Sequence, residues 1–183
     1  MSRPAPLLPG WRASMGTVPE MPGGAAGYRS WPGPARDMAL AIDAAVSAAR
    51  AGDAAAFKEA TDDLGRMDRE QLAVVLGAVT RELLERSHPD GLGASDAEEV
   101  LASCVRSAAS WDEPLSADSL IQALTGTLGI HDPDESAPPP GPVVVAHGLL
   151  LIADQLKIMK QPLPPVLDRA LRELMRAQTI EFP

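Results

Sequence analysis

Hydrophobic residues recur at helical spacing through most of the chain beyond residue 36. The clearest stretch is residues 68–86, where leucines and valines fall three and four positions apart, the period of an amphipathic α-helix. Asp68 stands three residues before Gln71, in place to cap the first turn. In its first half the opposite positions are small or apolar as well. We therefore predict a central helix that other segments surround on all sides over its first half, with a polar face that opens only after Thr80.

The same period marks further helices, each bounded by residues that start or stop a helix, such as Gly52, Pro89 and Gly129. No segment alternates apolar and polar residues over the length of a strand. Prolines near residue 164 interrupt or kink the last helical stretch, so the count is six or seven. The predicted helices cover residues 37–51, 53–65, 68–86, 95–110, 116–128, 143–160 and 165–178.

Proline and glycine divide the chain into parts. Residues 1–36 are so rich in both that no period survives, which predicts a flexible tail that is disordered when free. Residues 131–142 read as a proline-rich linker loop between five helices in 37–130 and a helical pair in 143–183 packed on the same core. We predict an all-α fold: a single bundle of six or seven helices with a disordered Pro/Gly-rich N-terminal tail.

Composition supports this fold class. The chain has 183 residues, enough for one domain with a sizeable core, and only 3% aromatic residues, so the core must be mainly aliphatic. The single cysteine, Cys104, excludes an internal disulfide and fits a reducing compartment. The N-terminus lacks the pattern of a secretory leader, and the longest apolar run, residues 143–153, is too short to span a bilayer. We expect a cytoplasmic protein without a membrane partner.

Charge is distributed unevenly. Residues 1–36 carry four arginines and one glutamate, a net +3, so with a whole-chain charge of −9 residues 37–183 carry −12. An acidic body repels nucleic-acid phosphates and anionic lipid surfaces. The expected partner is therefore another protein, which includes a second copy of this chain.

The basic tail also holds three of the chain's four large ring residues of the Trp and Tyr types. Trp11 is followed by Arg12, and Tyr28 by Arg29, with Trp31 close behind. Large aromatics and arginine are the residue types that most often anchor protein interfaces. These five residues are the predicted partner-binding anchors. The alternatives are a tail whose aromatics fold back on the body and an annotated start that is too long.

Candidate chemistry is sparse. The sequence contains no Walker A, GxSxG, HExxH or CxxC motif, and we expect no catalytic residue, metal or cofactor. His131 lies in an acidic loop that lacks the spacing of a calcium-binding EF-hand. His147 lies on an apolar helix, where a core histidine bonded to a neighbouring group is favoured over a ligand.

These observations favour a non-enzymatic helical interaction module, as an adaptor, scaffold or regulator, with an N-terminal docking tail. The alternative is a bundle that binds a small ligand in a pocket near His147. A third reading, a metal-dependent enzyme that uses His131 or His147, has the least support. An apolar cavity beside His147 would favour the ligand, and a packed core would favour the interaction module.

Overall fold

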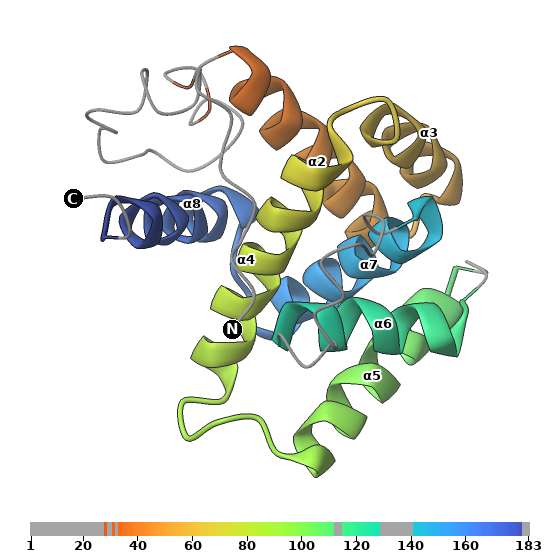
Figure 1. The fold of residues 1–183 in the computed structure, drawn as a ribbon. Coiled ribbons are helices and arrows are strands. Elements are labelled where there is room, and N and C mark those ends of the chain that lie inside the picture. Colours follow the sequence, from red (N-terminus) through yellow and green to blue (C-terminus); the bar gives the residue numbers. More distant parts are fainter. Residues whose placement is uncertain (1–27, 29–30, 32, 112–114, 129–140, 181–183) are drawn as a thin grey trace.

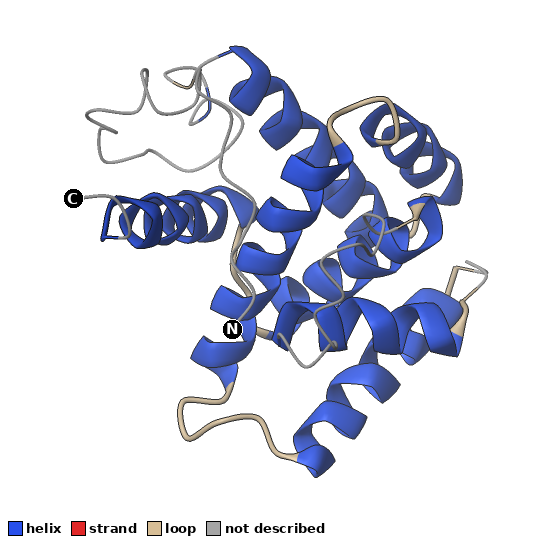
Figure 2. Ribbon diagram, in the orientation of Figure 1, coloured by secondary structure: helices blue, strands red, loops and turns tan. Residues whose placement is uncertain are grey.

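The computed structural model describes residues 28, 31, 33–111, 115–128 and 141–180. This part of the chain folds into seven helices and contains no strand (Figure 2), which confirms the all-α prediction. The helices are α2 (Gly33–Ala51), α3 (Ala54–Leu64), α4 (Arg69–Ser87), α5 (Ala94–Ala109), α6 (Ala117–Leu128), α7 (Pro142–Ile158) and α8 (Leu163–Ile180).

The first helix begins earlier than predicted. Helix α2 begins at Gly33, inside the segment 1–36 that we assigned to the tail. Pro34 explains the shift, because proline in the first turn of a helix lacks only an N–H that would have no partner there anyway. The predicted disorder of residues 1–27 lies outside the described residues. So does the linker 131–142, apart from its last two positions, where Gly141 caps α7 and Pro142 opens it.

Helix α7 lies at the centre of the fold (Figure 1). It packs against α2, α3, α4, α5 and α6, and every residue from His147 to Leu156 is buried. This includes Asp154, which is 5% exposed although its spacing placed it on a polar side. The sequence therefore identified the wrong central helix, because α4 has an open side and α7 does not.

Helix α4 begins as predicted. The carboxylate of Asp68 accepts a hydrogen bond from the N–H of Gln71 at 2.9 Å, which satisfies one of the unpaired amides of the first turn. Leu72, Val75, Leu76, Val79 and Leu83 are buried against α6, α7 and α8. The small residues on the opposite side are only half-buried, so the predicted enclosure of this helix is wrong.

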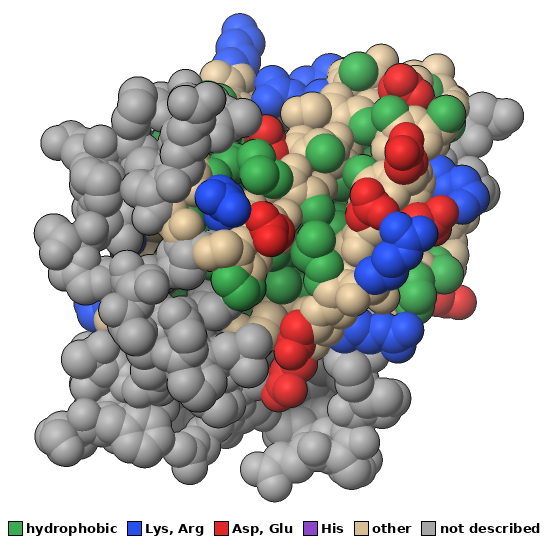
Figure 3. All heavy atoms as spheres, turned by 90° about the horizontal axis from the view of Figure 1, so that it is seen from above, with side chains coloured by type: hydrophobic (Ala, Val, Ile, Leu, Met, Phe, Trp, Pro, Cys, Tyr) green, Lys and Arg blue, Asp and Glu red, His purple; other side chains and the backbone are tan. Residues whose placement is uncertain are grey.

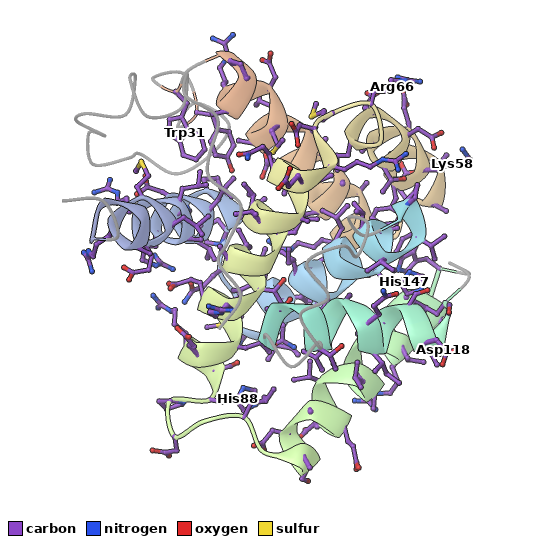
Figure 4. All side chains as sticks on the ribbon, viewed as in Figure 1. Trp31, Lys58, Arg66, His88, Asp118 and His147 are labelled. Atoms are coloured by element: carbon purple, nitrogen blue, oxygen red, sulfur yellow. The ribbon has the colours of Figure 1, made fainter. Side chains whose placement is uncertain are left out.

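The last two aromatics before α2 belong to the core. Tyr28 is fully buried and Trp31 is 6% exposed, and their rings meet edge to face at 5.2 Å. Figure 4 places Trp31 near the start of α2, above α8. An aromatic ring removes about 150–250 Å² from water on burial, enough to hold this part of the chain on the body. Docking of a partner by Tyr28 and Trp31 is thus corrected: in this fold neither ring reaches the surface.

Among the described helices, none is by itself long and apolar enough to cross a membrane. Only α7 and α8 taken together meet the requirement of length and composition, and they are bent by 117° at the break between them. On the face seen in Figure 3, acidic and basic side chains alternate with hydrophobic ones over the described surface. That part of the face shows no large patch of one charge.

The two sides of α4 give a matched test of the fold. Val79→Asp should lower the free energy of unfolding by several kcal/mol, because it places an unpaired carboxylate where the side chain is fully buried. Val74→Asp, on the half-buried side of the same helix, should have a much smaller effect. Urea denaturation followed by circular dichroism measures both. Equal losses would contradict the assignment of the two faces.

Candidate functional site

A groove of about 950 Å³ runs between α4 and α8, with the end of α6 at one side. We call it the α4–α8 groove. The groove is open because the side of α4 that faces away from the core carries small side chains in the first half of the helix. Its floor is formed by alanines, one glycine and one valine from two helices. These floor residues are Ala73, Val74, Gly77, Ala78, Ala170 and Ala177.

The small floor lets another chain approach closely. Ala73 and Gly77 lie one turn apart on α4, while Ala170 and Ala177 lie two turns apart on α8. A Cβ atom added at Gly77 would meet no other heavy atom within 4 Å, so the space above this residue is open. A segment in the groove can therefore contact the helices near their backbones.

Charged side chains form the rim. Four arginines line the groove, and three of them, Arg169, Arg172 and Arg176, follow one another at helical spacing on α8. Arg169 bonds through Nε to the Glu82 carboxylate of α4 at 2.6 Å and so ties the two walls together. Arg81 donates to the carbonyl oxygen of Thr127 at 2.9 Å and joins α4 to α6.

The other two rim arginines are paired within α8. Arg172 lies 3.0 Å from a carboxylate oxygen of Asp168, and Arg176 lies 3.1 Å from one of Glu173. These pairs hold the guanidinium groups along the helix. The Arg176–Glu173 pair is exposed and contributes little to stability, whereas the Asp168 carboxylate of the other pair is buried.

Two groups of the groove are left for a ligand. The Nη2 atom of Arg169 is buried and has no hydrogen-bond partner in the described structure. The carboxylate of Glu85 lines the groove and forms no ion pair with any described residue. A buried donor without a partner costs about 1–3 kcal/mol, so an acceptor at Arg169 would be stabilising. The groove thus combines an apolar floor with two polar groups that have no described partner, a donor on Arg169 and the carboxylate of Glu85.

His147, the predicted alternative site, lies on α7 (Figure 4), and both nitrogens of its ring are hydrogen-bonded. Its Nδ1 lies 2.7 Å from the carbonyl oxygen of Val143, and its Nε2 accepts the backbone N–H of Ser116 at 2.8 Å. A carbonyl can only accept and an amide can only donate, so Nδ1 carries the proton. The histidine thereby caps the start of α6 from inside α7. This is the core histidine that the sequence favoured, and neither cavity described here is lined by it.

Cys104 faces a cavity of only about 10 Å³ beside Asp154, room for a single water molecule. One carboxylate oxygen of Asp154 is buried there without a partner in the described structure. Burial, with the nearby charge of Asp154 as a smaller cause, raises the pKa of the Cys104 thiol to about 12. The thiol is therefore protonated at neutral pH and a poor nucleophile.

The described residues contain no cluster of three or more His, Cys, Asp or Glu side chains that could hold a metal ion. The remaining predicted site residues, Trp11, Arg12, Arg29 and His131, lie outside the described part, and their roles stay predictions. Sequence reasoning missed the groove. Its signals were the run of small residues around Gly77 and the spaced arginines on α8.

Comparison of the chain with protein-family models, with curated proteins and with solved structures finds no match in any of the three.

Replacing the capping histidine should destabilise the fold. His147→Leu leaves the Ser116 N–H without its acceptor, and we expect a loss of about 1–3 kcal/mol in the free energy of unfolding. His88→Leu is the control, because His88 is half-buried at the end of α4 and water can replace its bonds; its loss should stay below about 1 kcal/mol. Chemical denaturation measures the free energy of unfolding of both variants. Equal stabilities for His147→Leu and wild type would contradict the capping role.

Cys104 should resist alkylation in the folded protein. The folded thiol stays protonated above its ordinary pKa of 9.0, whereas the unfolded thiol ionises there. Its contribution to stability is therefore complete below pH 9 and falls as the pH rises toward 12. Iodoacetamide at pH 8 should label Cys104 only in urea, while a Ser47→Cys variant, exposed on α2, is labelled in the native state at that new position. Rapid native labelling of Cys104 would show that the site opens.

Proposed function

We propose that this protein is a non-enzymatic protein–protein interaction module whose α4–α8 groove receives a segment of a partner protein. The observation that carries the proposal is the groove itself: an open apolar floor between α4 and α8 with charged side chains along its rim. Clefts lined by apolar residues with a few placed polar groups are the usual form of binding sites. The predicted cytoplasmic location accompanies this proposal as an expectation.

The polar groups favour an extended segment as the ligand. In a helix the carbonyl oxygens are used internally, except in the last turn. In a polyproline or other extended segment they remain free and can accept from Arg169. Small or apolar side chains of such a segment fit the floor near Gly77, and a basic side chain would pair with Glu85. The partner class is thus a protein with an exposed, extended, apolar and basic stretch.

No reaction is assigned to the protein. The two described side chains best suited to catalysis are both engaged in the core, His147 by two backbone groups and Cys104 by burial as a protonated thiol. A pocket for a small ligand beside His147 is not proposed, because its ring nitrogens are already bonded. The groove remains the strongest candidate for recognition.

Filling the groove should prevent binding. A photo-crosslinking residue at Ala78 is expected to capture the partner in cells, while the same residue at Ala55, exposed on α3, does not. With the captured protein purified, Gly77→Leu should weaken its affinity at least tenfold in a calorimetric titration, about 1.4 kcal/mol, because the leucine occupies the floor.

Gly77→Ala is the matched control. It adds only a methyl group to open space and should raise the free energy of unfolding by about 0.5–1 kcal/mol, because glycine is unfavourable within a helix. Its affinity should stay close to wild type. Binding that survives Gly77→Leu, in a variant that melts as cooperatively as wild type, would remove the groove from the function.

A further inference from the structure

Three buried donors lie without partners in the described structure, and all three are on or near α8 or the start of α2. They are the hydroxyl of Tyr28, the indole N–H of Trp31 and Nη2 of Arg169. The first two mark the place where the N-terminal tail, residues 1–27, joins the body. The third belongs to Arg169, one of the residues that line the groove. Because an unsatisfied buried donor is costly, an acceptor supplied to any of the three would be stabilising.

The tail has the chemistry to supply these acceptors. It contains five prolines, which favour extended backbone whose carbonyl oxygens are free of internal hydrogen bonds. It also contains Trp11, a residue large enough to cover a floor of alanines and glycine, followed by Arg12. These features complement the groove: apolar side chains match its floor, carbonyl oxygens can accept from Arg169, and a cation can pair with Glu85.

The tail is also long enough to reach the groove. Seventeen steps of chain separate Trp11 from Tyr28, which at about 3.3 Å per residue span about 55 Å when extended. Helix α8 has 18 residues and is therefore about 27 Å long. The extended chain between Trp11 and Tyr28 is therefore about twice as long as α8.

From these observations we infer that the N-terminal tail of the same molecule occupies the α4–α8 groove when no partner is bound, with Trp11 on the floor beside Gly77 and Arg12 against Glu85. The inference rests on the proposed function, since it uses the groove as a site for extended segments. It adds regulation: a partner must displace the tail, so the tail lowers the apparent affinity of the groove.

The full-length chain with a spin label in the tail tests this directly. Ser14→Cys places the label three residues from Trp11, and the buried Cys104 is the only other thiol. In the NMR spectrum the amide signals of Ala78 and Ala177 should lose intensity, whereas that of Ala55 on α3 should not. Gly77→Leu should restore the lost signals, and Gly77→Ala should leave them broadened.

Charge exchange gives a second readout. Arg12→Glu should restore part of the signal at Ala78 by repulsion from Glu85, and the double variant Arg12→Glu with Glu85→Arg should broaden it again. Wild-type broadening that is indifferent to both substitutions would overturn the assigned contact between Arg12 and Glu85.

A mixing experiment separates the molecule's own tail from that of a second copy. Isotope-labelled protein without a spin label is mixed with unlabelled, spin-labelled protein. No broadening in the mixture, together with broadening in the single-molecule experiment, supports the inference. Broadening in the mixture, or none in either sample, overturns it. In that case a tenfold loss of partner affinity in Gly77→Leu would still support the groove as a partner site, so the two failures can be told apart.

Discussion

The complete burial of α7 is the constraint on which the rest of the fold depends. A helix that touches water on no side from His147 to Leu156 must be covered all round, and five other helices are placed to do this. Every polar group inside it then needs a partner or a pocket of water. His147 meets this requirement by binding Ser116, so the same side chain that makes α7 costly to bury fixes where α6 begins. Asp154 meets it less completely and lies beside a cavity of the size of one water.

The near absence of aromatic residues shapes both the core and the groove. Alanine and glycine let helices approach closely, but they cannot fill space between helices that diverge. Where α4 and α8 separate, small side chains leave an open floor instead of a packed seam. The described aromatic residues form two pairs: Trp111 packs edge to face on the buried Phe57 at 5.5 Å, and Tyr28 packs on Trp31 just before α2.

The periodic pattern predicted the helices well, because helix formation is decided by residues within a few turns of one another. The cap at Asp68 followed from such local rules, and so did the contact of His147 with the carbonyl of Val143 one turn away, whereas its contact with Ser116 joins distant parts of the chain. Which helix is central did not follow, since it depends on contacts between segments far apart in the chain. The small residues around Gly77 illustrate this. Small and apolar positions are equally consistent with a buried face and with an open groove, and only the position of α8 distinguishes them.

Helix α8 is held on one side more than on the other. It packs chiefly on α4, with a smaller contact to α2, and the Arg169–Glu82 pair is a polar tie across the groove. Segments with few buried contacts open at lower free energy than the core. The width of the groove therefore depends on how firmly the outer half of α8 is held against α4. A segment bound between α4 and α8 would contact both helices and so hold α8 more firmly against the rest of the fold.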